Sequence, residues 1–170
     1  MRQKAEMEAS MPRNADSLKL EQAVMLVRSA DPMKGIKMLQ QLVEADSTNV
    51  DAHYYLGEFS MQSGQMPKAI GRFEKVLKLR PDDVKYLVQV GYNYLQMDSL
   101  NRSLNCFEKA TAIDSTENNA LFFIAQICER TGNLEKAKLK YEALLRHNTD
   151  AVVDSNVRTY IKNIDIKFKK

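Results

Sequence analysis

The chain repeats itself every 34 residues, without gaps, over residues 16–49, 50–83, 84–117 and 118–151. Three columns of this alignment have a fixed side-chain size. The eighth residues are Ala23, Gly57, Gly91 and Ala125, and the twentieth are Gly35, Ala69, Ser103 and Ala137, all of them small. The twenty-fourth are Leu39, Phe73, Phe107 and Tyr141, all of them large. A fixed period of this length is typical of an array of stacked supersecondary units.

The size pattern predicts two antiparallel helices in each repeat. Two helices approach closely only where the facing side chains are small, so we expect the eighth and twentieth residues to meet where the helices cross. We expect the large twenty-fourth residue to fill the space between neighbouring hairpins. Turn-forming residues lie between the two helices of each repeat, at Asp31-Pro32, Gly64–Pro67, Asp98-Ser99 and Gly132-Asn133. Asp31 can cap the helix whose first turn contains Pro32.

These residues resemble the tetratricopeptide repeat family. The second repeat carries the signature best, at Leu56-Gly57, Gly64, Ala69, Phe73 and Pro81. The resemblance implies an all-α fold, a right-handed α-solenoid of four helix-turn-helix hairpins over 16–151. Apolar residues at helical spacing after the fourth repeat predict a capping helix over 152–166, followed by a basic tail that ends at 170. Residues 1–15 are expected to form a polar leader.

Charge and hydropathy exclude several kinds of partner. The net charge is +3, and the whole excess lies in the last nineteen residues, which carry five basic and two acidic side chains. Nucleic acid is therefore not an expected partner, because binding it requires a basic surface across the fold. No apolar run is long enough to insert into a membrane. The polar start predicts a cytoplasmic protein; a bacterial periplasmic or membrane-tethered protein whose upstream anchor had been removed is the alternative.

Residues that could support catalysis are scarce. The only cysteines are Cys106 and Cys128, and the only histidines are His53 and His147, with no spacing typical of metal ligands. We expect both thiols to be free and buried or half-buried, His53 to be packed, and His147 to be solvated. No phosphate-binding glycine loop or hydrolase motif is present. The sequence therefore predicts a non-enzymatic protein with no cofactor, no metal and no catalytic residue.

The resemblance implies a concave surface formed by the first helix of each repeat. Carried over column by column, its candidate partner-binding residues are Leu20, Val24, Val27, Arg28, Tyr54, Glu58, Met61, Lys85, Val88, Tyr92, Leu95, Phe122, Gln126 and Arg130. Most are apolar or aromatic, and an exposed apolar stripe of this size usually marks a contact surface. The lysine and asparagine pair with which some members hold an acidic chaperone tail is missing from these columns.

We therefore expect an interaction scaffold whose groove binds an apolar or amphipathic segment of another protein. Tyr54, Tyr92 and Phe122 are the expected anchors, and Arg28, Glu58, Lys85 and Arg130 the orienting charges. Two alternatives stay open at this point. The stripe could be covered by the chain itself or form a homodimer as a self-associating structural module. The chain could also be the soluble part of a membrane-tethered bacterial protein that acts in envelope assembly.

Overall fold

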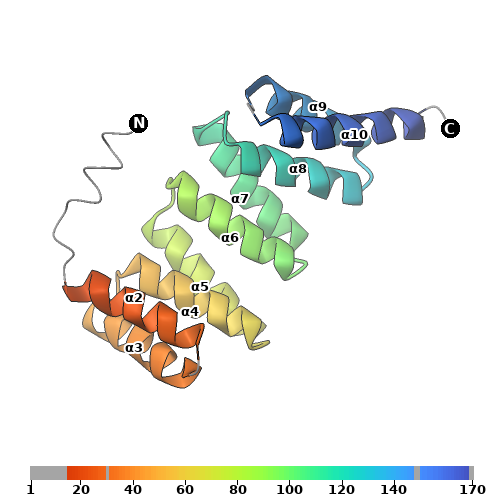
Figure 1. Cartoon of the computed structure of the whole chain (residues 1–170). Helices are drawn as coiled ribbons and strands as arrows, with labels where there is room; N and C mark the ends of the chain where they lie inside the picture. The colour runs from red at the N-terminus through yellow and green to blue at the C-terminus, as the bar shows by residue number, and fades with distance from the viewer. Residues whose placement is uncertain (1–14, 30, 148–149, 169–170) are drawn as a thin grey trace. The chain divides into compact units, whose positions relative to one another are not determined.

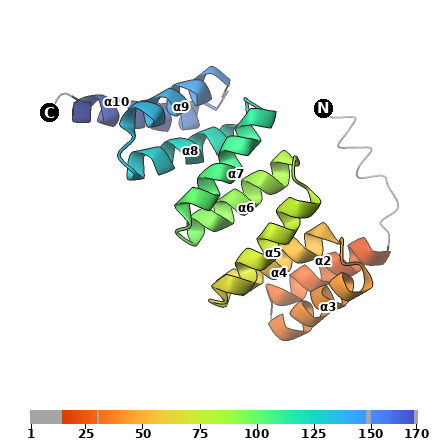
Figure 2. The ribbon, with the colours of Figure 1, turned by 180° about the vertical axis from the view of Figure 1, so that it is seen from behind.

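The computed structural model describes residues 15–29, 31–147 and 150–168, and within these ranges all regular structure is α-helical. The helices, labelled in Figures 1 and 2, are α2 (Ala15–Val27), α3 (Pro32–Ala45), α4 (Val50–Gln62), α5 (Met66–Leu79), α6 (Val84–Gln96), α7 (Leu100–Ile113), α8 (Asn118–Arg130), α9 (Leu134–His147) and α10 (Ala151–Phe168). Each 34-residue repeat thus contains two helices, and the predicted all-α solenoid class is confirmed. The expected leader over 1–15 lies outside the described residues except for Ala15.

The helices form two compact units, Met1–Leu79 and Arg80–Lys170. In the N-terminal unit, α2 packs against α3, α4 packs against α5, and α3 contacts α4. In the C-terminal unit the pairs are α6 with α7 and α8 with α9, while α10 contacts α9. Figure 1 shows α6, α8 and α10 in front of α7 and α9, and Figure 2 shows the second helices from behind. The first helices of successive repeats therefore share one face of this unit.

The close approach of the paired helices confirms the role of the small columns. A Cβ atom added at Gly35 would lie 2.5 Å from the backbone oxygen of Ala23, the eighth residue of the same repeat. In the third repeat the Ser103 hydroxyl donates a 2.8 Å hydrogen bond to the backbone oxygen of Gly91. A larger side chain at these positions would push the helices apart, so the size pattern fixes the crossing.

The large twenty-fourth residues are all fully buried. Phe107 stacks on Phe123 of the next repeat with ring centroids 5.1 Å apart, and Tyr141 stacks on Tyr160 of α10 at 5.4 Å. In the third repeat this contact lies between neighbouring hairpins, and in the fourth it lies between the hairpin and α10. The same side chains also fill the space inside their own hairpin, because a Cβ at Gly91 would come within 2.9 Å of the Phe107 ring.

The turns between the paired helices of the second, third and fourth repeats share one backbone feature. Gly64, Asp98 and Gly132 recur at the 34-residue period and all have a positive φ, of 75°, 54° and 80°. Glycine adopts this conformation without steric cost, whereas Asp98 is strained there. In the first repeat, Asp31 caps α3 by accepting a hydrogen bond from the Lys34 backbone N–H, as the sequence predicts.

The predicted capping helix appears as α10, which extends beyond the expected 152–166 at both ends. Val157 and Ile164 are fully buried, and Lys138 on α9 forms an ion pair with Asp165. Phe168, the last apolar residue of the predicted pattern, is half exposed and does not join the buried face. The buried stripe of α10 therefore ends one turn earlier than the sequence pattern.

Candidate functional site

The expected partner-binding residues lie on the first helices of the repeats, except Arg28, which follows the end of α2 in the turn before α3; seven of them lie in each compact unit. Those in the N-terminal unit form what we call the α2–α4 face, made of Leu20, Val24, Val27, Arg28, Tyr54, Glu58 and Met61. Those in the C-terminal unit form the α6–α8 face, made of Lys85, Val88, Tyr92, Leu95, Phe122, Gln126 and Arg130. Helical spacing places each set on one side of its helices, because residues three or four apart are neighbours on a helix surface.

The α6–α8 face has an aromatic centre that is open to solvent. Tyr92 is 44% exposed, and its ring lies 5.4 Å from that of Phe123 on the next first helix. Phe123 also contacts Phe122 edge-on at 5.6 Å. Val88 and Leu95, one turn to either side of Tyr92 on α6, are half-buried. These apolar side chains, which we call the apolar patch, include a row of ring contacts from Tyr92 through Phe123 to Phe122, whose ring also contacts Tyr160 on α10.

Charged side chains border this patch. Arg130 at the end of α8 forms a 2.8 Å ion pair with Asp98, which follows α6 in the turn before α7. The Lys85 ammonium lies over the Tyr86 ring, 5.3 Å from its centroid. The expected orienting charges Arg130 and Lys85 thus lie at opposite ends of the face, since they belong to the last turn of α8 and the first turn of α6.

The α2–α4 face is partly used for packing. Leu20 and Val27 pack against the buried core of the N-terminal unit. Outside this core, Leu20 and Val24 line a pocket of about 510 Å³ together with Tyr55 and Arg28. The face therefore keeps one apolar depression between α2 and α4.

Tyr54, one of the three expected anchors, is only 7% exposed. Its ring lies 6.2 Å from the buried Phe73 ring, and its hydroxyl donates a 2.8 Å hydrogen bond to Glu58. The Glu58 carboxylate also lies 4.0 Å from the Arg28 guanidinium. Tyr54 therefore packs beneath the surface of the α2–α4 face and offers a partner little contact area. Arg28 and Glu58 interact with each other across this face.

Two aromatic residues were missed by the sequence analysis. Tyr55 lines the pocket of the α2–α4 face, and the Phe123 ring packs against the exposed Tyr92 ring. Both occupy the sixth position of their repeats, next to the fifth position that the family pattern assigns to the concave surface. An aromatic residue in that neighbouring column was the available signal.

The cysteines and histidines have the packed or solvated settings that the sequence predicts. Cys106 and Cys128 are buried and free; burial raises the pKa of the Cys106 thiol to about 11 and raises that of Cys128 as well. His53 is buried, and His147 is exposed. Across the described ranges, no group of three His, Cys, Asp or Glu side chains could hold a metal ion. None of the described helices is long and apolar enough to cross a bilayer.

Comparisons with known proteins agree with this architecture. Two family models, both described as tetratricopeptide repeat, match residues 26–89 and 84–117. Among solved structures, a tetratricopeptide repeat protein from Parabacteroides merdae aligns with a TM-score of 0.76 at 13% identity, over 91% of this chain and 61% of that one. MamA from Desulfovibrio magneticus aligns with a TM-score of 0.72 at 16% identity, over 92% and 86%. At such identities the likeness concerns the fold.

Protein CTR9 homolog from Arabidopsis thaliana is 27% identical over 75 residues, which are 44% of this chain. The match covers 7% of that relative's length. The two family models together extend from residue 26 to residue 117, more than half of the chain, and carry the 34-residue period and the hairpin geometry described above. The chain belongs to the tetratricopeptide repeat family.

Proposed function

We propose that this chain is a non-enzymatic protein-interaction scaffold whose α6–α8 face binds an apolar or amphipathic segment of another protein. Repeats of this family are protein-interaction scaffolds, so the open question is which surface binds and what it binds. The supporting observation is the exposed Tyr92 ring, which lies on Phe123 between half-buried Val88 and Leu95. Exposed aromatic and aliphatic side chains on a rigid support are the usual energetic centre of an interface.

The geometry fits a helix or an extended segment with one apolar side. Tyr92 and Phe122 provide contact area on neighbouring helices, and their rings are already ordered by Phe123. Ordered side chains lose little conformational entropy on binding. Arg130 at the border is paired with Asp98 and can exchange that exposed partner for a carboxylate of the bound segment.

A double substitution tests the proposal. Tyr92→Ala with Leu95→Ala removes the centre of the patch, and affinity capture with the intact chain should lose the partner. Ile113→Ala with Leu139→Ala is the matched control, because these exposed apolar residues lie on the second helices of the same unit. Both variants should keep the helical circular dichroism of the wild type. Partner capture that survives the Tyr92/Leu95 double variant would refute binding through the α6–α8 face.

The same variants separate partner binding from self-association. A homodimer formed through the α6–α8 face would dissociate on dilution, and the Tyr92/Leu95 double variant would be monomeric at concentrations at which the wild type is not. Light scattering over a hundredfold dilution should instead give a monomer mass for both proteins.

A further inference from the structure

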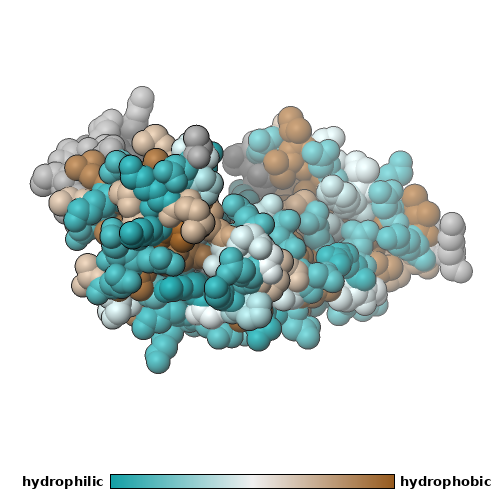
Figure 3. All heavy atoms as spheres, turned by 90° about the horizontal axis from the view of Figure 1, so that it is seen from below, coloured by the Kyte–Doolittle hydropathy of each residue, from teal (hydrophilic) through white to brown (hydrophobic). Residues whose placement is uncertain are grey.

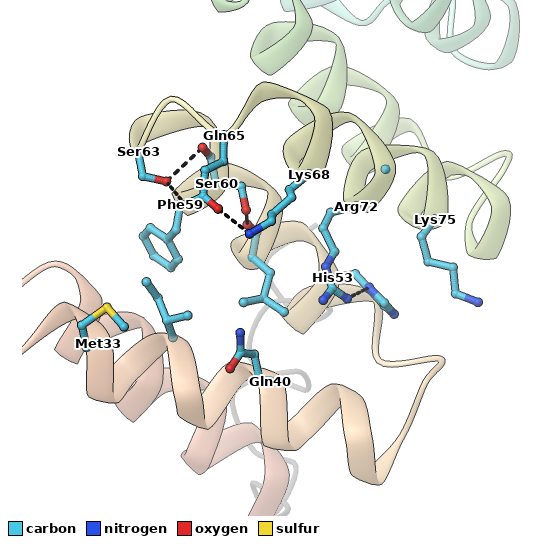
Figure 4. A pocket seen from close by; sticks show the side chains of 13 residues that line it. Met33, Gln40, His53, Phe59, Ser60, Ser63, Gln65, Lys68, Arg72 and Lys75 are labelled. Carbon is cyan, nitrogen blue, oxygen red and sulfur yellow. Dashed lines mark hydrogen bonds between the residues drawn. The ribbon is translucent and has the colours of Figure 1, made fainter.

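A second pocket lies in the N-terminal unit, away from the α2–α4 face. Its volume is about 520 Å³. Residues of α3, α4 and α5 line it, with α3 and α5 on opposite sides (Figure 4). Its volume falls within the range of ligand pockets. We call it the basic pocket, and its lining residues run from Met33 on α3 to Lys75 on α5.

One wall of the basic pocket is cationic. Lys68, Arg72 and Lys75 follow one another along α5 at the i, i+4 and i+7 spacing that aligns side chains on one face of a helix. No Asp or Glu lines the pocket, and in the part of the chain that the structure describes no carboxylate pairs with these three side chains. A Cβ at Gly71, in the same row, would touch nothing within 4 Å, so the space between the cations is open.

Two of the three cations of this wall, Lys68 and Arg72, are held in place by neutral partners. The Lys68 ammonium donates a 2.6 Å hydrogen bond to the Gln65 side-chain oxygen. The Arg72 guanidinium donates to Nδ1 of His53 at 2.9 Å, while Nε2 of His53 donates to the backbone oxygen of Ser47 at 3.1 Å. This arrangement requires a neutral imidazole with its proton on Nε2. His53 therefore positions Arg72 without neutralising it.

The electrostatics at His53 agree with an uncompensated positive wall. Burial lowers the pKa of His53, and the positive charges of Arg72 and Lys75 on α5 lower it further. The hydrogen bond to the backbone oxygen of Ser47 raises the pKa, with an effect second only to that of burial, and the carboxylate of Asp46 raises it least.

The opposite wall of the basic pocket carries apolar side chains and one neutral amide. Met33, Ile36 and Gln40 on α3 and Phe59 on α4 line it, and Met33 is 74% exposed. In Figure 4, Met33 and Gln40 lie on the α3 side, facing Lys68 and Arg72 across the pocket. A ligand that fills this space must present negative charge to α5 and an apolar group to α3.

We infer that the basic pocket binds an acidic, apolar-flanked segment of a partner protein, with its carboxylates on Lys68, Arg72 and Lys75 and an apolar side chain against Met33, Ile36 and Phe59. The charge complementarity selects carboxylates, and the apolar wall selects a peptide side chain over a bare anion or a nucleic acid strand. The site is built from α3, α4 and α5, so it shares no residue with the α6–α8 face of the proposed function.

The test uses the full chain and a fluorescein-labelled peptide of alternating glutamate and leucine, followed by fluorescence anisotropy. Lys68→Gln with Lys75→Gln should weaken binding about tenfold, equivalent to about 1.4 kcal/mol. Lys37→Gln with Lys78→Gln is the matched control, because it removes the same charge from exposed lysines of α3 and α5 that do not line the pocket. The control variant should bind within about twofold of the wild type.

Further measurements locate the peptide. Its addition should shift the ring resonances of His53 and leave those of His147, the only other histidine, unchanged. The Tyr92→Ala/Leu95→Ala variant should bind the acidic peptide as the wild type does, which separates this site from the one in the proposed function.

Three results would overturn the inference. Equal weakening in both lysine variants would mean unspecific attraction to net positive charge. Equal affinity for a peptide with glutamine in place of glutamate would mean that the carboxylates are not recognised. Binding to phosphatidylglycerol vesicles that the Lys68/Lys75 variant loses, without any binding of the peptide, would assign the pocket to a lipid surface instead.

Discussion

Replacing Gly35 by alanine tests the helix crossing on which the fold depends. The added Cβ would lie 2.5 Å from the backbone oxygen of Ala23, 2.5 Å from a methyl carbon of Val27 and 2.7 Å from the Val27 backbone nitrogen. Two of these atoms belong to the backbone of α2, so no rotamer change can relieve the contact. The helices α2 and α3 must move apart, which loosens the core around Leu39.

The size of the effect follows from two opposing contributions. Overpacking a close contact costs about 1–3 kcal/mol and more where backbone must move. Alanine gains up to about 1 kcal/mol over glycine from its helix propensity. We therefore expect Gly35→Ala to lower the free energy of unfolding by about 2 kcal/mol, which for a chain of this length lowers Tm by about 4–8 °C.

Gly71→Ala is the matched control. Gly71 lies inside α5, and a Cβ there would meet nothing within 4 Å. Only the propensity gain remains, so this variant should be more stable than the wild type by about 0.5–1 kcal/mol. Urea unfolding followed by circular dichroism at 222 nm measures both. Gly35→Ala with wild-type stability or better would refute the close approach of α2 and α3.

Three further predictions concern buried groups. Ser103→Ala should cost about 1 kcal/mol in urea unfolding, because it removes the hydrogen bond to the Gly91 backbone oxygen; no change in stability would show that the bond is energetically neutral. Cys106 should resist a thiol reagent at about pH 8 in the native protein and react on unfolding, because its pKa is raised to about 11; fast labelling of native protein would contradict its burial. The pKa of His53 is lowered in the folded state, so the unfolded chain binds more protons as the pH falls through the usual value of 6.5. Unfolding free energy should therefore drop between about pH 7.5 and pH 5, and drop less in a His53→Gln variant than in a His147→Gln control; equal pH dependence in the two variants would refute this role.

The hairpin architecture was predictable because it depends on side-chain size at fixed spacing. Gly35 and Ser103 must be small for the helices to cross, and Phe107 and Tyr141 must be large to fill the space beside them. These requirements recur in every repeat, so one sequence shows them several times. The positions of the turns were predictable for the same reason, since Gly64 and Gly132 provide the positive φ that the connection needs.

Exposure within a column was not predictable, because it depends on neighbours from other helices. Tyr54 and Phe122 hold the same fifth position of their repeats. Tyr54 is buried against Phe73 and its hydroxyl donates a hydrogen bond to Glu58, whereas Phe122 is only half-buried. The family pattern assigned both to the binding surface, and the contacts across the hairpin decide how much of each ring a partner could reach.

The basic pocket also could not be predicted from the sequence. Lys68, Arg72 and Lys75 are ordinary solvated residues in a sequence whose charges nearly cancel over each long segment. These cations face the apolar side chains of Met33 and Ile36 only because α3 and α5 pack on either side of α4. The amino-acid sequence by itself determined the period, the helices and the fold class, because these follow from spacing along one chain. Tertiary structure alone decided which side chains face one another across helices, because that depends on distances that no local pattern encodes.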